Sequence, residues 1–148
     1  MTARSEVSLL EPLTVLDAPD RGDVQYLDDR INEFNMSRTG ITDVRPLAVF
    51  VRDDRTEIVA GVHGWTWGGC CEVKTLWVHE QWRGLDLGTR LIAAVENEAR
   101  ARGARQIVLS THSFQAPDFY RRLGFEPIGH FEDYPVGYQS IYLRKPLL

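Results

Sequence analysis

Apolar positions along the chain fall into short segments that alternate between helical and strand-like spacing. Val24, Leu27, Ile31 and Phe34 recur at helical steps, which predicts one helix or two short helices over Asp23–Ser37. The segments that follow are mostly strand-like, so the pattern predicts a mixed chain with an early helical part.

The strand-like segments are rich in β-branched and aromatic residues and are bounded by turn-forming residues. Asp53–Thr56 has the composition of a hairpin turn, so antiparallel neighbours are expected in the first half of the chain. Strands are predicted at Val7–Asp17 (an edge strand), Pro46–Arg52, Glu57–Trp67, Cys71–Val78, Gln106–Thr111, Phe125–Phe131 and Tyr138–Arg144.

A second helix is predicted over Leu87–Arg102, because Leu87, Leu91, Val95 and Ala99 recur every four residues. It separates two strand-like segments, and a strand–helix–strand unit of this spacing is expected to join parallel strands by a right-handed crossover. A short helix is predicted over Ala116–Leu123. The order of elements is that of an α/β (α+β) fold, and 1–148 is expected to be a single domain.

The turn before the second helix is the first candidate for a ligand-binding site. Val73–Ala94 reads as a strand, a turn containing Gly84 and the first half of a helix. The first N–H groups of such a helix are free and lie at the positive end of its dipole, so an attached phosphate is the natural ligand. An ordinary strand–helix connection with a glycine in its loop would show the same pattern.

Composition narrows the classes of partner. The net charge is −4, from 17 basic and 21 acidic residues, which argues against nucleic acid as the main partner. No apolar run approaches the roughly 20 residues that span a bilayer, and no secretory signal is expected. Cys70 and Cys71 are adjacent and predict no disulfide framework, so a cytoplasmic location is expected.

Two sequence blocks make the phosphate interpretation specific. Gln81–Gly88, preceded by the apolar run Leu76–Val78, resembles the acetyl-CoA loop of the GNAT superfamily of N-acetyltransferases. Ser113–Phe125 resembles the helix and strand start that follow in that superfamily, and the resemblance extends from Ala48 to the C-terminus. It implies a mixed, mostly antiparallel twisted sheet with one splayed parallel pair of strands and flanking helices.

The resemblance also implies an activity and a cofactor. The expected reaction moves an acetyl group from acetyl-CoA to the primary amine of a small molecule, a metabolite or an antibiotic, by direct transfer in a ternary complex. A non-catalytic acyl-CoA sensor, a protein or peptide amine as acceptor, and a scaffold without nucleotide ligand stay open. No metal, nucleic acid or membrane partner is expected, and a homodimer is possible.

The residues expected to hold acetyl-CoA come from both blocks. By resemblance, the strand Leu76–Val78 pairs with the pantetheine arm and the turn Arg83–Thr89 meets the diphosphate, where arginine suits phosphate geometry. The full set is Leu76, Trp77, Val78, Arg83, Gly84, Leu85, Asp86, Leu87, Gly88, Thr89, Ser113, Phe114, Ala116 and Tyr120.

One residue of this set departs from the family pattern. Asp86 stands where the family has a small residue, and its carboxylate would repel a diphosphate unless it points away. Because Asp is a favoured N-cap, we expect Asp86 to cap the second helix. Ser113 replaces the family's asparagine beside the pantetheine arm.

The catalytic assignments follow the family positions. Tyr120 is expected to be the general acid that protonates the leaving thiolate, the alternative being a core tyrosine. Glu72 is the expected base, the alternative being an ion pair with Lys74 on the same strand face. His63 and His112 are further candidates for the base.

Residues for the acceptor are predicted from aromatic character and, for the early helix, from the position at which the resemblance implies acceptor contacts. Trp65 and Trp67 share one strand face, Tyr134 lies in the loop of 132–137, and Asn35 lies on the early helix beside Asn32 and Arg38. Core and edge packing is the more common use of most such aromatic residues.

Overall fold

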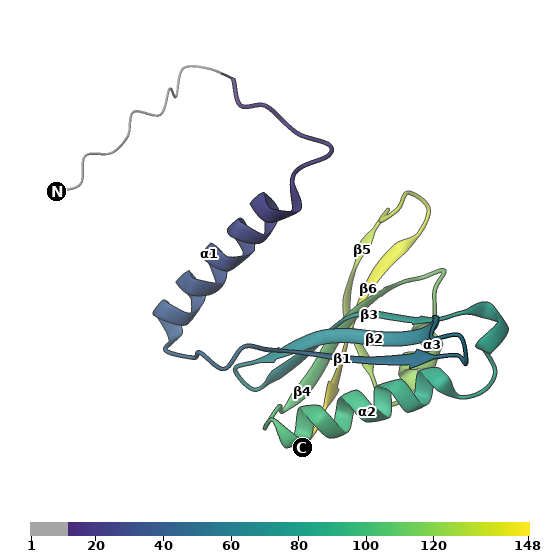
Figure 1. Ribbon diagram of the computed structural model, residues 1–148. Helices are drawn as coiled ribbons and strands as arrows, with labels where there is room; N and C mark the ends of the chain where they lie inside the picture. Colours follow the sequence, from purple (N-terminus) through teal and green to yellow (C-terminus); the bar gives the residue numbers. More distant parts are fainter. Residues whose placement is uncertain (1–11) are drawn as a thin grey trace. The chain divides into compact units, whose positions relative to one another are not determined.

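The computed structural model describes residues 12–148, which divide into two compact units, one ending at Gly40 and one spanning Ile41–Leu148 (Figure 1). Part of the predicted edge strand over Val7–Asp17 lies outside the described residues. Its described part, 12–17, forms no strand, so that part of the prediction is wrong.

The first unit contains one continuous helix, α1, over Arg21–Thr39. The Asp20 carboxylate accepts hydrogen bonds from the N–H groups of Gly22 and Asp23, which satisfies two of the free donors at the helix start. The helix ends at Gly40, whose left-handed backbone lets its N–H bond the Met36 carbonyl at 2.9 Å. The two caps set the ends of α1, and the helix is continuous between them, so of the two predicted alternatives the single helix forms.

The second unit is built on a six-stranded sheet in the order β1-β2-β3-β4-β6-β5 (Figure 1). Every neighbouring pair is antiparallel except β3 and β4, so the predicted fold class is confirmed. The strands are β1 Arg45–Arg52, β2 Ile58–Trp67, β3 Cys70–Val78, β4 Gln106–His112, β5 Glu126–Glu132 and β6 Gln139–Pro146.

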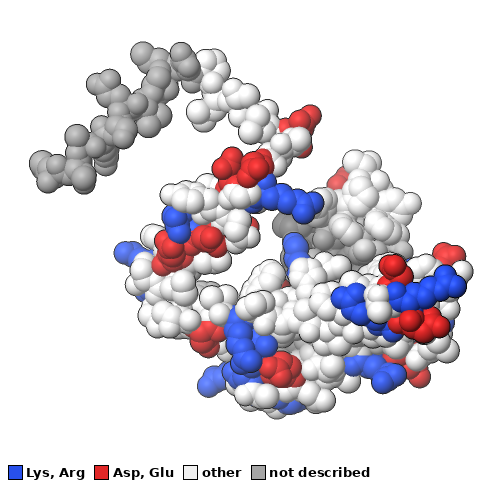
Figure 2. Space-filling model, in the orientation of Figure 1, with Lys and Arg blue, Asp and Glu red and all other residues white. Residues whose placement is uncertain are grey.

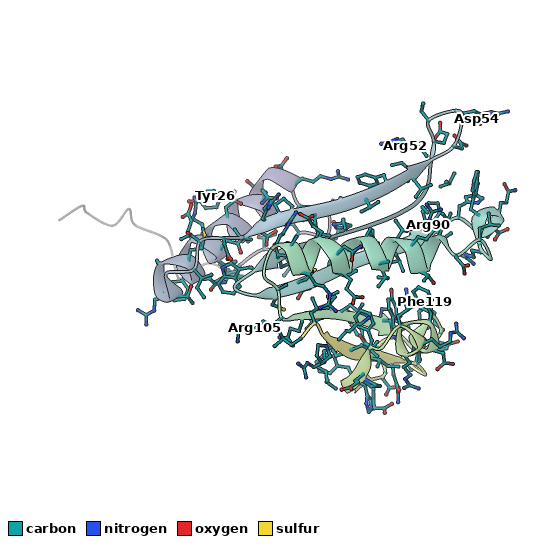
Figure 3. All side chains as sticks on the ribbon, turned by 90° about the horizontal axis from the view of Figure 1, so that it is seen from below. Tyr26, Arg52, Asp54, Arg90, Arg105 and Phe119 are labelled. Atoms are coloured by element: carbon teal, nitrogen blue, oxygen red, sulfur yellow. The ribbon has the colours of Figure 1, made fainter. Side chains whose placement is uncertain are left out.

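Helix α2, Leu87–Ala101, lies against one face of this sheet, next to β1, β2 and β3 (Figures 1 and 3). Its buried residues Leu91, Ile92, Val95 and Ala99 follow the predicted stripe and join the core. A single 3₁₀ turn over Glu80–Trp82 and a short helix α3, Pro117–Arg122, complete the unit. No helix within 12–148 has the length and apolar character needed to cross a membrane.

Side chains in the second half of α2 and directly after it fix the helix to both halves of the sheet. The Arg102 guanidinium, just beyond the helix, donates to the carbonyls of Arg45 and Pro46 on β1 and to Thr66 Oγ1 on β2. The Glu96 carboxylate accepts from Lys145 Nζ of β6 at 2.8 Å, and this ion pair is mostly shielded from solvent. The C-terminal half of α2 is therefore held in a defined place relative to the strands.

Strands β3 and β4 separate after a short parallel ladder. They pair at Cys70–Gln106, Cys71–Ile107 and Glu72–Val108, and β3 continues to Val78 without β4 beside it. The separation coincides with a bulge on the other edge of β3, where Lys74 has no partner in β2.

Gly64 of β2 makes this bulge possible. A Cβ atom at position 64 would lie 1.9 Å from the Glu72 carbonyl oxygen and 3.0 Å from the Val73 Cα. Such distances are far below van der Waals contact, so the backbone of β3 approaches β2 closely only because residue 64 has no side chain. The glycine thus helps to set where β3 turns away from β4.

Candidate active site

The separation of β3 and β4 opens a cleft of about 1280 Å³ in the second unit. It runs from the turn before α2, between the two strands, to α3 and β6. Most of the residues predicted to bind acetyl-CoA or the acceptor line it: Leu76, Trp77, Val78, Arg83, Gly84, Asp86, Leu87, Gly88, Thr89, Phe114, Ala116, Tyr120 and Tyr134.

The turn at one end of the cleft presents unpaired N–H groups. Arg90 N–H bonds the Asp86 carbonyl as the first intrahelical bond of α2, which leaves the N–H groups of 87–89 without a partner among the described residues. Gly84, with φ of 79°, turns the chain into this position. Free N–H groups at a helix start are the arrangement from which the sequence predicts an anion site.

The prediction that Asp86 caps α2 is wrong. Asp86 occupies the N-cap position with φ of 59°, in the left-handed region, and its carboxylate accepts no hydrogen bond from the helix. The usual cap geometry needs an extended backbone at that residue, and the left-handed backbone takes the side chain away from the free N–H groups. These N–H groups therefore stay available to a ligand.

Replacing Asp86 by asparagine is expected to tighten CoA binding several-fold. Asparagine tolerates the left-handed backbone and removes a negative charge beside the diphosphate site. Titration calorimetry with CoA measures the effect, which should shrink as salt screens the charge. Glu126→Gln, the same charge change on β5 outside the cleft, is the control; equal affinity of both variants and the parent would contradict the placement of Asp86.

Arg83 links this turn to the end of β3. Its Nε donates to the Val78 carbonyl at 3.1 Å, and the other nitrogens of the guanidinium are free to meet an anion. Three basic residues line the cleft, Lys74, Arg83 and Arg122, against one acidic residue, Asp86. On the face drawn in Figure 2, basic and acidic side chains otherwise lie interspersed. The excess of positive charge in the cleft favours an anionic ligand.

The edge of β3 that faces the cleft offers backbone hydrogen bonds. His79 N–H bonds the Val59 carbonyl in β2, and N–H groups along a strand point to alternate sides, so the N–H groups of Leu76 and Val78 point away from β2. No β4 residue pairs with them. They face the cleft as free donors for an extended amide-rich ligand.

Tyr120 reaches the cleft from α3. Its side chain is 8% exposed and packs edge-on against Phe119 and Phe125, at ring-centroid distances of 5.1 and 5.7 Å. The hydroxyl has no hydrogen-bond partner among the described residues, and burial raises the pKa of Tyr120 to about 12. Phe119, labelled in Figure 3, packs next to Gly88 at the start of α2. A Cβ added at Gly88 would lie 3.1 Å from the Phe119 ring.

His112 lies in the cleft at the end of β4. Its Nδ1 is 2.9 Å from the Tyr134 carbonyl oxygen, and its ring stacks on Phe114 with a centroid distance of 5.3 Å. The Tyr134 ring meets it edge-on at 5.4 Å. These contacts hold the imidazole in one orientation.

Several predicted residues lie outside the cleft lining. Glu72 is the last residue of the β3–β4 ladder, opposite Trp65 in β2, and it makes no ion pair with Lys74. Ser113 Oγ accepts a hydrogen bond from Gln139 N–H at 3.0 Å, so it is engaged by β6. Leu85 is exposed, and the Trp67 indole N–H donates to the Ile41 carbonyl.

Trp65 on β2 also lies outside the cleft lining. Asn35 lies on α1 in the first unit, and its role stays a prediction. Some cleft residues were not predicted. Ser110 is one of them and lies two residues before His112 on the same face of β4, so strand alternation could have indicated it. Lys74 lies at the bulge of β3, which no local sequence pattern predicts. The unpredicted residues include Lys74, Thr75, Trp82, Ser110, Gln115, Phe119, Arg122, Ser140 and Tyr142.

Comparison with known proteins identifies the family. The profile of the acetyltransferase (GNAT) domain matches residues 45–127, which are more than half of the chain. The chain belongs to the GNAT family of acetyltransferases. It is therefore an acyltransferase, and the resemblance in its sequence blocks is confirmed.

Individual GNAT relatives support this assignment over most of the chain. The blasticidin-S acetyltransferase of Streptomyces morookaense is 38% identical over 119 residues, 76% of this chain and 85% of that protein. An acetyltransferase of Agrobacterium fabrum is 31% identical over 129 residues, 87% of this chain and 94% of that protein.

Solved GNAT structures show the same fold. An acetyltransferase from Agrobacterium tumefaciens superposes with a TM-score of 0.82 at 29% identity and covers 92% of this chain and 99% of that one. An aminoglycoside 6′-N-acetyltransferase in complex with coenzyme A has a TM-score of 0.63 at 18% identity, with 91% and 98% covered, and shows the shared fold alone.

Proposed function

We propose that this GNAT protein transfers an acetyl group from acetyl-CoA to the primary amine of a small molecule. The observation that carries the proposal is one continuous cleft that joins the free N–H groups of 87–89 to the unpaired hydroxyl of Tyr120. An anion site and a hydrogen-bond donor in one opening suit a donor that carries both a diphosphate and a thioester.

The residues present fit acetyl-CoA. The turn of 83–89 supplies backbone donors and a guanidinium for the diphosphate, and the open edge of β3 supplies donors for the amides of the pantetheine arm. When bound, acetyl-CoA supplies an activated acyl group. The N–H of Leu76 or Val78 can then stabilise the negative charge that develops on the carbonyl oxygen, which is the usual main contribution to acyl transfer.

Direct transfer in a ternary complex is favoured over a covalent acyl-enzyme. The free cysteines Cys70 and Cys71 lie at the closed end of the β3–β4 ladder, outside the cleft lining. Burial raises the pKa of the Cys71 thiol to about 11 and also raises that of Cys70, so neither is a thiolate at neutral pH. The acceptor amine must therefore attack the thioester itself.

A small-molecule acceptor, an antibiotic in particular, is proposed from the relatives. The relative with 38% identity is named for the antibiotic blasticidin S, and the match covers most of both proteins. Acyl-CoA binding without turnover is the alternative that an experiment must separate from this reaction.

One experiment separates these functions. The protein is first titrated with CoA in a thermal-shift assay, where a ligand at 100 times its dissociation constant adds about 2.7 kcal/mol of stability. Thiol release from acetyl-CoA is then followed with a panel of amines that includes blasticidin S. Amine-dependent thiol release supports the acetyltransferase, binding without thiol release supports the sensor, and no shift with CoA contradicts both.

A further inference from the structure

The proposed reaction needs a group that takes a proton from the acceptor nitrogen. Among the cleft residues of the Ile41–Leu148 unit, Lys74, Arg83 and Arg122 are cationic, and the hydroxyls are weak bases. The carboxylate in the lining is that of Asp86, in the turn where the diphosphate is expected. His112 is the cleft side chain whose neutral form readily accepts a proton.

We propose that His112 is the general base of the acetyl transfer and that the Tyr134 carbonyl fixes the tautomer in which it acts. The inference rests on the proposed function, since it assigns a residue to that reaction. It replaces Glu72, which lies outside the cleft lining at the last paired position of β3.

The hydrogen bond at Nδ1 decides which nitrogen is the base. A carbonyl oxygen only accepts, so the 2.9 Å contact with the Tyr134 carbonyl requires the proton of the neutral ring to be on Nδ1. Nε2 then carries the free lone pair, and it has no partner among the described residues. A base with its lone pair directed away from the backbone is what proton abstraction requires.

The register of the sheet places His112 and Tyr120 on opposite faces. Leu109 and Thr111 of β4 are buried and pair with the buried Leu143 and Ile141 of β6, on the core face that α2 covers. By strand alternation His112 lies on the other face. Tyr120 belongs to the core cluster and so reaches the opening from the covered side.

A thioester lying between β3 and β4 would then have a base on one side and a hydrogen-bond donor on the other. As the C–N bond forms, His112 Nε2 takes the N–H proton of a neutral amine. The C–S bond breaks with its electron pair on sulfur, and the Tyr120 hydroxyl stabilises that charge by donating a hydrogen bond to the sulfur. Solvent takes the proton from the imidazolium and gives a proton to the thiolate, so the products are the amide and the free thiol.

The wild-type protein tests the tautomer without turnover. Long-range proton–nitrogen NMR spectra of ¹⁵N-histidine-labelled protein distinguish a protonated Nδ1 from a protonated Nε2. We expect the neutral His112 ring to carry its proton on Nδ1. Finding it on Nε2 would overturn the proposal, whatever the activity of the protein.

Two variants test the base itself. His112→Asn keeps a donor for the Tyr134 carbonyl and removes the basic nitrogen, so kcat should fall by about 100-fold, the lower range for general-base catalysis, with little change in CoA affinity. His112→Ala should regain part of its rate when imidazole is added. His130→Asn, on β5 outside the cleft, is the matched control.

Any pH profile of the reaction must take account of the other titratable or charged side chains in the cleft. These are Lys74, Arg83, Asp86, Tyr120, Arg122, Tyr134 and Tyr142.

The outcomes separate this inference from the proposed function. If the wild type acetylates an amine and folded His112→Asn retains the full rate, or if Glu72→Gln alone removes it, His112 is not the base. If the wild type acetylates no amine, the proposed function fails first, and only the tautomer measurement bears on His112.

Discussion

Replacing Gly64 by alanine is expected to destabilise the protein by about 3 kcal/mol, the upper range for overpacking, and to abolish CoA binding. The added Cβ would lie 1.9 Å from the Glu72 carbonyl oxygen. The nearest atoms that it would meet all belong to the β3 backbone, so the clash cannot be relieved by the movement of a flexible side chain. Relief requires β2 and β3 to separate at the bulge where β3 leaves β4. Denaturant unfolding and calorimetry with CoA measure the two effects.

Gly129→Ala is the matched control, because it makes the same change in strand β5, where an added Cβ meets nothing within 4 Å. A strand glycine replaced by alanine without a clash should leave stability unchanged or raise it slightly. Equal unfolding midpoints for Gly64→Ala and the parent would show that the bulge does not depend on close approach of the two backbones.

Replacing Tyr120 by phenylalanine is expected to lower kcat by about 100-fold with CoA affinity nearly unchanged, since the hydroxyl acts only as sulfur leaves. A pKa of about 12 makes the phenol a weaker acid than a thiol, so it acts by hydrogen-bonding the sulfur as charge develops. The neutral hydroxyl is required, so Tyr120 ionisation should cost the wild type no activity below about pH 11.

The control for this variant is Tyr138→Phe, because Tyr138 is exposed and lies outside the cleft lining. Steady-state kinetics and CoA titration of both variants complete the test. A Tyr120→Phe variant with the parental kcat would assign the residue to packing, the alternative that its aromatic contacts with Phe119 and Phe125 also allow.

Most of the fold could be predicted because it depends on local patterns. The four-residue spacing of Leu91, Val95 and Ala99 identifies the buried face of α2, and the predicted strands of the second unit agree with the structure to within two residues at each end. The turn before α2 was also predictable, since glycine and helix position alone determine where N–H groups stay free.

The errors and omissions share one physical cause, which is tertiary context. Asp86 is a good cap by residue type, but the backbone at that position is left-handed. The bulge at Lys74 depends on Gly64, ten residues earlier on another strand, and Ser113 is engaged by Gln139 from β6. The local periodicity of the sequence predicts none of these contacts. A cytoplasmic location and a homodimer stay predictions.

The central claim is that the cleft between β3 and β4 holds acetyl-CoA, and a crystal structure with bound CoA tests it most directly. We expect the diphosphate on the N–H groups of 87–89, the pantetheine arm along Leu76–Val78 and the sulfur within hydrogen-bond distance of the Tyr120 hydroxyl. CoA bound elsewhere, with β3 and β4 unoccupied between them, would contradict the account.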